Sequence, residues 1–130
     1  MSESVNPENW PRPSGYSNGV IAQGRHLAIS GQIGWNERYE LVSDDFFEQA
    51  CQALSNVVAV LRAAGGSPEH LVRLTWYVTD KDEYRAALRA LGRAYRSIVG
   101  EHYPAMALVQ VADLLEEGAK VEIEATAILP

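Results

Sequence analysis

Apolar residues recur at every second position in several short stretches of the chain. In residues 26–34, Leu27, Ile29 and Ile33 alternate with polar or small residues, which is typical of a half-buried strand. The same alternation occurs in residues 71–79 and 120–129. We predict a strand in each of these three stretches.

Two further strands are predicted from shorter apolar runs, at residues 17–23 and 105–111. We expect the first to form a hairpin with residues 26–34 through Gly24-Arg25, with Asn18-Gly19 as a competing turn. For residues 105–111 the pattern leaves open which side chains face the core.

The period changes to that of a helix in residues 44–64. Ser43 or Asp44 can cap the first turn, and Gly65-Gly66 stops the helix. Cys51 lies in the apolar stripe, and we interpret it as a buried structural cysteine rather than a reactive thiol. The predicted stripe comprises Phe47, Cys51, Leu54, Val58 and Leu61.

A second helix is predicted to run to about Val99. Asp80 and Glu83 have the spacing of a capping box, Gly100 ends the helix, and Pro104 prevents its continuation. The predicted buried stripe comprises Tyr84, Leu88, Leu91, Tyr95 and Ile98. Trp76, in the preceding strand, has the parity of a core residue.

The predicted order is β-β-α-β-α-β-β, an α/β (α+β) domain of one sheet with two helices on one face. We expect one domain over residues 1–130, with residues 1–14 as an extended N-terminal arm. The uncovered face carries Arg73, Tyr77 and Glu122, among others, and is mixed in polarity. Such a face commonly packs against symmetry-related copies, with polar pockets at the seams. The alternative is a face exposed to solvent.

Composition indicates an ordinary globular protein and excludes some partners. Hydrophobic residues make up 47% of the 130 residues, and the formal net charge is −6. This charge argues against nucleic acid, which requires clustered Lys and Arg, and against anionic membrane surfaces. The single cysteine and the lack of a signal-like segment favour the cytoplasm. The three histidines lack metal-ligand spacing, so we predict no metal.

Several motifs in order along the chain resemble one family, the Rid (YjgF-like) reactive-intermediate deaminases. The motifs are Gly15-Tyr16, residues 29–33 (ISGQI), residues 54–57 (LSNV), residues 78–80 (VTD), residues 103–105 (YPA) and residues 121–125 (VEIEA). The resemblance implies a chorismate-mutase-like fold and a homotrimer with a central barrel and three clefts between subunits. It also implies cofactor-free hydrolysis of enamines or imines, such as 2-aminoacrylate and its imine tautomer, to a keto acid and ammonia.

The chain departs from the archetypal members at the substrate cleft. They carry an Arg after the Pro-Ala of the fifth strand, where it binds the substrate carboxylate, and this chain has Met106. Methionine offers no hydrogen-bond donor to replace that guanidinium. Leu88 aligns with an archetypal Asn, and Leu108 aligns with a small thiol site. The resemblance therefore implies a divergent branch with a more apolar cleft.

The remaining cleft residues retain groups suited to hydrolysis of a C=N bond. Glu122 aligns with the family's cleft glutamate, which would activate the attacking water. We assign substrate binding to a set that comprises Tyr16, Ser30, Gly31, Leu88, Met106, Ala107 and Leu108. Three of the candidate residues have a simpler structural interpretation. Glu122 is then a polar residue inside the barrel, Tyr16 packs at a subunit interface, and Gly31 is small only to let two strands approach closely.

Three functions remain open. The leading hypothesis is an enamine or imine deaminase whose small-molecule substrate is larger or more apolar than 2-aminoacrylate. The second is a trimeric protein that binds a small metabolite without turning it over, which the apolar Met106 and Leu108 favour. The third, a ribonuclease, is disfavoured by the acidic composition.

Overall fold

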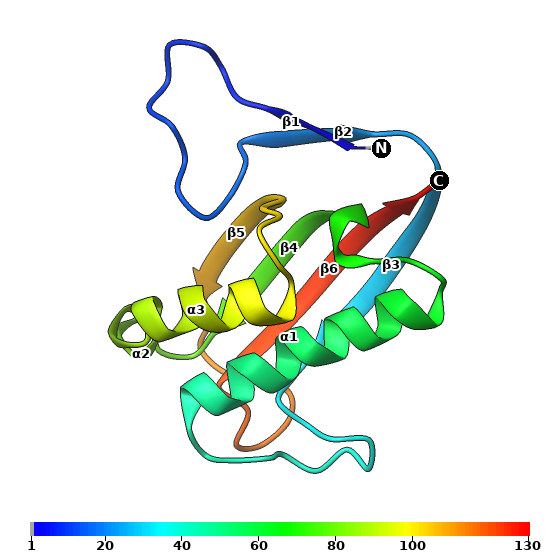
Figure 1. Ribbon diagram of the computed structural model, residues 1–130. Coiled ribbons are helices and arrows are strands. Elements are labelled where there is room, and N and C mark those ends of the chain that lie inside the picture. The colour runs from blue at the N-terminus through cyan, green and yellow to red at the C-terminus, as the bar shows by residue number, and fades with distance from the viewer. Residues whose placement is uncertain (1) are drawn as a thin grey trace.

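The computed structural model describes residues 2–130, in which a four-stranded sheet is covered by helices on one face (Figure 1). The main sheet has the strand order β3-β6-β4-β5, and a separate two-stranded sheet pairs β1 with β2. The strands are β1 (Ser2–Val5), β2 (Gly19–Ala22), β3 (Arg25–Gln32), β4 (Leu71–Val78), β5 (Ala105–Gln110) and β6 (Val121–Leu129). This confirms the predicted mixed α+β class with the helices on one side of one sheet.

Strand β6 lies in the middle of the main sheet. It pairs antiparallel with both β3 and β4, whereas β5 joins the outer edge of β4 in parallel. The alternation predicted for β4 is confirmed, because Leu74 and Trp76 are buried under the helices while Arg73 is exposed. The side chains of Tyr77 and Glu124 are hydrogen-bonded to each other on the opposite, uncovered face.

Helix α1 (Phe46–Ala63) spans most of the covered face (Figure 1). Its cap is Asp45, whose carboxylate accepts a hydrogen bond from the Glu48 N–H, and not the predicted Ser43 or Asp44. The Ser43 hydroxyl instead accepts a hydrogen bond from the Asp45 N–H, and this bond helps to position Asp45 as the cap. The buried stripe is also rotated from the prediction and comprises Phe46, Gln49, Ala50, Ala53, Leu54, Val57, Val58 and Leu61.

The rotation of this stripe leaves two predicted core residues at its edge. Phe47 and Cys51 are half-buried rather than fully buried. Burial and the negative charges of Asp45 and Glu48 raise the pKa of the Cys51 thiol. The thiol is therefore held in its protonated, less nucleophilic form, as expected for a structural cysteine.

The second predicted helix is interrupted. It consists of α2 (Lys81–Ala86), capped by Asp80 as predicted, and α3 (Leu88–Ile98). The Ala87 N–H is shared between the carbonyls of Glu83 and Tyr84, both at 3.1 Å. This shared bond tightens the last turn of α2 and shifts the rotation at which α3 begins. As a result Leu88 is 51% exposed, contrary to its place in the predicted buried stripe.

The predicted hairpin between the second and third strands is wrong. Strand β2 pairs with β1, in the register Ser2↔Ala22, and β3 pairs with β6 instead. The chain changes direction at Gly24, whose φ is +148° and where a Cβ would clash with the Leu129 carbonyl. Only glycine tolerates both conditions. The first part of the expected arm is thus a strand that lies apart from the main sheet.

Candidate functional site

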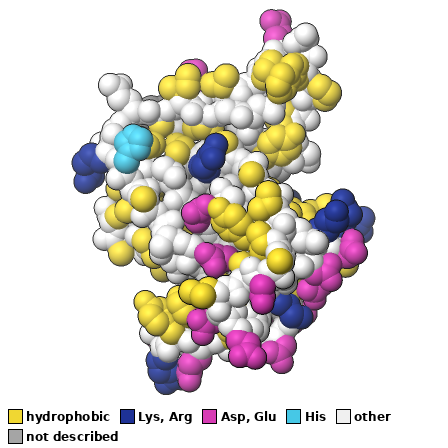
Figure 2. Space-filling view, turned by 180° about the vertical axis from the view of Figure 1, so that it is seen from behind, with side chains coloured by type: hydrophobic (Ala, Val, Ile, Leu, Met, Phe, Trp, Pro, Cys, Tyr) yellow, Lys and Arg dark blue, Asp and Glu magenta, His cyan; other side chains and the backbone are white. Residues whose placement is uncertain are grey.

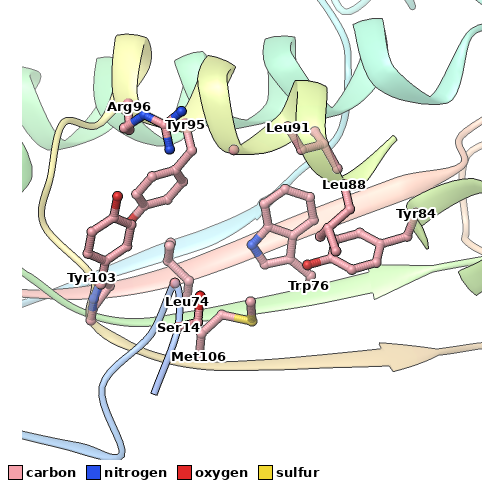
Figure 3. Close-up of a pocket in the computed structure, with 13 residues that line it drawn as sticks. Ser14, Leu74, Trp76, Tyr84, Leu88, Leu91, Tyr95, Arg96, Tyr103 and Met106 are labelled. Carbon is pink, nitrogen blue, oxygen red and sulfur yellow. The ribbon is translucent and has the colours of Figure 1, made fainter. Parts of the chain in front are cut away.

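A pocket of about 330 Å³ lies between helix α3 and the sheet (Figure 3). Its volume is at the lower end of the range for small-molecule sites, about 300–1,000 Å³. The lining residues come from the segment before β2, from β4, α2 and α3, and from the start of β5. They are Ser14, Gly15, Leu74, Trp76, Tyr84, Leu88, Leu91, Gly92, Tyr95, Arg96, Tyr103, Pro104 and Met106.

The N-terminal segment is held at the pocket by Ser17. Its hydroxyl donates to the Tyr103 carbonyl at 2.6 Å, and its N–H donates to the Pro104 carbonyl at 3.1 Å. The Ser17 hydroxyl also lies 3.0 Å from that of Ser4 in β1. These contacts place Gly15 in the pocket wall beside the start of β5. They give a physical role to two of the sequence motifs, the one before β2 and the one before β5.

Four of the residues that line the pocket are aromatic. Trp76 packs edge-on against Tyr84, with ring centroids 5.9 Å apart, and Tyr95 stacks on Tyr103 at 5.5 Å. The Tyr95 hydroxyl donates to the His102 carbonyl at 2.6 Å. Burial raises the pKa values of Tyr84 and Tyr95, and for Tyr95 the neighbouring Tyr103 adds to this effect. Both phenols therefore present neutral rings at physiological pH.

Two of the predicted substrate-binding residues, Leu88 and Met106, meet in this pocket. Met106 pairs with Leu74 in the register of β4 and β5, and its side chain is therefore on the helix side of the sheet (Figure 3). Leu108 has the same parity and packs against the core. Ala107 has the opposite parity, pairs with Thr75 and faces away from the pocket.

The sequence interpretation did not include Arg96, which also lines this pocket. Arg96 extends from α3 at the end of the pocket that holds Tyr95 and Tyr103 (Figure 3). One of its terminal nitrogens would lie 3.8 Å from a Cβ placed at Gly92, so the side chain runs along the helix face past Gly92. Leu88, Gly92 and Arg96 are spaced at i, i+4 and i+8 and so share one helix face. Because Leu88 was a predicted site residue, this spacing could have identified Arg96 from the sequence as a residue on the same side of the helix.

A second group of predicted residues lies on the uncovered face, where β3 meets β6. A Cβ at Gly31 would clash with the carboxylate of Glu122, so that carboxylate lies directly over the Gly31 backbone. The pairing of β3 and β6 shifts between Ile29 and Gln32. Ser30 and Gly31 lie within this irregularity, which opens the strand beside Glu122.

Helix α1 fixes the end of β3 next to this carboxylate. The Asn56 side-chain amide donates to the carbonyls of Ile33 and Trp35, at 3.1 and 2.8 Å. The Asn56 oxygen accepts from the Gln52 side chain at 2.9 Å, which orients it. Asn56 belongs to one of the sequence motifs, and its contacts explain the amide there. It donates to the Trp35 carbonyl and adds a second donor to the Ile33 carbonyl, which also accepts from the Trp35 N–H.

The rest of this side of the molecule is mixed in polarity, with charged side chains of both signs among hydrophobic ones (Figure 2). The Tyr77 hydroxyl donates to the Glu124 carboxylate at 2.5 Å, and this bond raises the pKa of Tyr77. Arg73 and Thr75 line a shallow hollow of about 200 Å³ on the same face. Charged groups of both signs thus lie on a surface that no helix of this chain covers.

Within one chain the two groups of predicted residues lie on opposite faces of the sheet. Leu88 and Met106 line the pocket on the helix side, whereas Gly31 and Glu122 lie on the uncovered side. Tyr16 is 39% exposed and is absent from the pocket lining, although both of its neighbours, Gly15 and Ser17, help to build the pocket. One chain alone therefore does not assemble the whole predicted cleft.

Residues 2–130 contain no group of three or more His, Cys, Asp or Glu side chains placed to hold a metal ion. Among the helices in this described part of the chain, none is long and apolar enough to span a membrane.

The fold and pocket define a small α+β domain that can enclose a small molecule against one sheet. A sequence model described as Endoribonuclease L-PSP matches residues 9–129. The chain belongs to this family, which is also known as the Rid or YjgF-like family.

Known relatives extend over nearly the whole chain. A 2-iminobutanoate/2-iminopropanoate deaminase of Escherichia coli strain K12 is 36% identical over 129 residues, covering 98% of both proteins. The crystal structure of YyfB from Yersinia pestis, a Rid family protein of unknown function, matches with a TM-score of 0.87 at 36% identity, covering 98% of each chain. E. coli TdcF with bound serine matches at 28% identity and a TM-score of 0.72, covering 98% of this chain and 99% of that one.

Proposed function

We propose that this protein is an enamine or imine deaminase, which hydrolyses a C=N bond, or its enamine tautomer, to a carbonyl and ammonia. The observation that carries the proposal is the Glu122 carboxylate over the Gly31 backbone, where any larger residue would displace it. The E. coli relative named as an iminobutanoate deaminase, 36% identical over 129 residues, supports the same class of reaction.

The reaction needs a base, a proton for nitrogen and no redox partner. Water adds to the carbon of the protonated imine while Glu122 accepts one of the water's protons, which leaves a neutral amino alcohol. The amino alcohol then collapses: Glu122 returns its proton to nitrogen, the C–N bond breaks and ammonia leaves. The hydroxyl group gives its proton to the freed Glu122 carboxylate as the carbon becomes a carbonyl. A positioned carboxylate contributes about 10²–10⁴-fold to such proton transfers. The residues named here hold or move protons without a metal or an organic cofactor.

The proposal includes a homotrimer, because the two halves of the site lie on opposite faces of one chain's sheet. A barrel built from three copies would cover the mixed surface of Arg73, Tyr77 and Glu124. It would also allow the Glu122 side of one copy to approach the Met106 pocket of another. We further propose a single cytoplasmic domain, in keeping with the one cysteine of the chain.

We propose a substrate larger or more apolar than 2-aminoacrylate. The pocket that contains Met106 and Leu88 is bounded by Trp76, Tyr84 and Leu91. These side chains surround an apolar group well and offer few donors to a small polar substrate. The ribonuclease alternative has less support, since the chain carries a net charge of −6 and phosphate binding requires clustered cations.

The test of the proposed function is turnover of imines made in place by an amino-acid oxidase. We expect Glu122→Gln to lower kcat by about 10²-fold or more and Glu122→Asp to restore part of it. Glu117→Gln, at an exposed position in the loop before β6, is the matched control and should retain full activity. Unchanged turnover in Glu122→Gln would disprove the assigned mechanism.

The second candidate function is a protein that binds a small metabolite without turning it over. The observation that favours it is the apolar Met106 in place of a carboxylate-binding Arg. Failure of wild type to accelerate imine decay, combined with retention of an unchanged ligand, would establish this alternative.

A further inference from the structure

Arg96 is the only charged side chain among the residues that line the pocket. The other lining residues are aromatic, aliphatic or small, or carry a neutral hydroxyl. Three other arginines, Arg85, Arg89 and Arg93, lie on α2 and α3, but none of them reaches the pocket lining. The pocket therefore combines an apolar body with one positive group at one end (Figure 3).

Arg96 has no acidic partner within ion-pair distance among residues 2–130. The ion pairs in this part of the chain use Arg38, Arg85 and Lys120 as cations. Exposed arginines often lack partners, so this alone does not define a site. Here, however, the unpaired guanidinium borders a pocket whose other walls bear no charge, and an anion is what would complement it.

Gly92 supplies an independent reason to associate Arg96 with a ligand. A glycine inside a helix is destabilising relative to alanine. At Gly92 the absence of a side chain widens the pocket under the guanidinium, whose nearest nitrogen lies 3.8 Å from the position of a Cβ. The helix therefore has no side chain at the point of the pocket wall that lies beside the Arg96 guanidinium.

We propose that Arg96 binds the carboxylate of a small molecule whose aromatic or branched aliphatic body fills the pocket. The proposal rests on the proposed function, and it names the substrates as 2-imino acids with such side chains. The binding cation is then supplied by α3, across the pocket from Met106, instead of by β5. The carboxylate lies at the Tyr95 and Tyr103 end, and the apolar body extends toward Trp76, Tyr84 and Leu88.

Direct binding tests this without requiring turnover. By calorimetry we expect 3-phenylpropanoate to bind wild type, and both 3-phenylpropanamide and propanoate to bind much more weakly. The first comparison removes the charge, and the second removes the apolar body. Arg96→Gln should weaken 3-phenylpropanoate by about 10- to 100-fold, as loss of a charge-assisted hydrogen bond predicts. Arg93→Gln, one turn earlier and exposed outside the pocket, should bind as wild type does.

A rescue variant separates ligand binding from a general loss of structure. In the Arg96→Gln background, Met106→Arg places a guanidinium on the opposite wall of the same pocket and should restore carboxylate binding. Equal binding of the amide and the carboxylate, or wild-type affinity in Arg96→Gln, would overturn the proposal.

The outcomes distinguish this inference from the proposed deaminase function. Binding that depends on Arg96, without turnover of the phenylalanine-derived imine, supports the Arg96 site and refutes the deaminase. Turnover that depends on Glu122 but is unchanged in Arg96→Gln, in both kcat and KM, supports the deaminase and refutes the Arg96 site. A raised KM with Arg96→Gln, together with a lowered kcat with Glu122→Gln, supports both.

Discussion

Helices α1 and α3 cover the same face of the sheet, yet they pack on it in different ways. Helix α1 buries eight of its 18 residues, whereas α3 buries only Leu91. Two polar side chains of α1, those of Gln49 and Asn56, bind backbone groups of neighbouring segments. Helix α3 instead stacks Tyr95 on Tyr103, just before β5, and leaves a pocket between itself and the sheet.

The two helices divide the roles of the domain: the region of α1 contributes mainly to stability, and the region of α3 mainly to binding. Where α1 lies, its buried side chains fill the space against the sheet or bind backbone groups, so a substitution at one of these buried positions leaves a void or an unpaired group. Beneath α3, the pocket takes the place of part of the contact between the helix and the sheet. Substitutions at its lining should change ligand binding more than they change the free energy of unfolding.

The largest expected effect is at Gln49, which has no exposed surface. Its amide nitrogen donates to the carbonyls of Ser43 and Gly118, at 2.9 and 3.0 Å, and its oxygen accepts from the Lys120 N–H at 2.8 Å. Gln49→Leu leaves all three backbone groups without this partner and should cost about 3–9 kcal/mol in the free energy of unfolding, at roughly 1–3 kcal/mol per buried unpaired group. Urea denaturation measures it.

The matched control for this substitution is Gln52→Leu, one turn away on the same helix. It removes one bond between partly buried side chains, from Gln52 to Asn56. It should cost only about 1 kcal/mol. Equal losses in the two variants would contradict the role assigned to Gln49.

An intermediate effect is expected from shortening one leucine on each helix. Leu54 of α1 is 1% exposed, and Leu54→Ala should cost about 2–5 kcal/mol. Leu88 of α3 is 51% exposed, and Leu88→Ala should cost less than about 1 kcal/mol. Denaturation of both variants, combined with binding of 3-phenylpropanoate, tests the contrast. A larger stability loss for Leu88→Ala than for Leu54→Ala would show that the two helices do not differ as described.

The smallest effect concerns alkaline pH and the Tyr95 phenol. Burial raises its pKa above the usual value of about 10, so the folded state keeps a proton that the unfolded state loses. This contribution to stability is complete below pH 10 or so and is lost as the pH rises through the folded-state pKa. Wild type should therefore lose more stability between pH 8 and pH 11 than Tyr95→Phe does, in parallel urea titrations.

The control for the titration is Tyr39→Phe, because the Tyr39 ring is 72% exposed. This variant should follow the wild-type pH dependence. Tyr95→Phe also lacks the bond to the His102 carbonyl, so its stability at pH 8 should already be lower by about 0.5–1.5 kcal/mol. An identical pH dependence of wild type and Tyr95→Phe would rule out a buried, raised-pKa phenol.

The sequence predicted what depends on local periodicity. The strand alternation of residues 71–79 and 120–129 agrees with β4 and β6, and Trp76 is in the core as predicted. Turn and cap residues also predicted where helices end, since Gly100 has a φ of +102° just after α3. Each of these features is determined within a few residues along the chain.

Features that depend on distant partners could not be obtained in this way. Strand β2 pairs with β1, and Gly24, which follows β2, packs against Leu129, more than 100 positions away. Gln49 looks like a surface glutamine until the loop before β6 is placed against it. For the site, Leu88 and Met106 do meet in one pocket, but the separation of Glu122 onto the other face required the strand order.

The central position of β6 also has a consequence for how the chain folds. Strands β3 and β4 never pair with each other, since each is hydrogen-bonded to β6. During synthesis, β4 and β5 can pair as soon as both have emerged, but β3 has no partner until residues 121–129 are made. Contacts over such long sequence separations slow folding. We therefore expect the sheet of the nascent chain to remain incomplete, with the apolar face of α1 exposed to chaperones, until β6 leaves the ribosome.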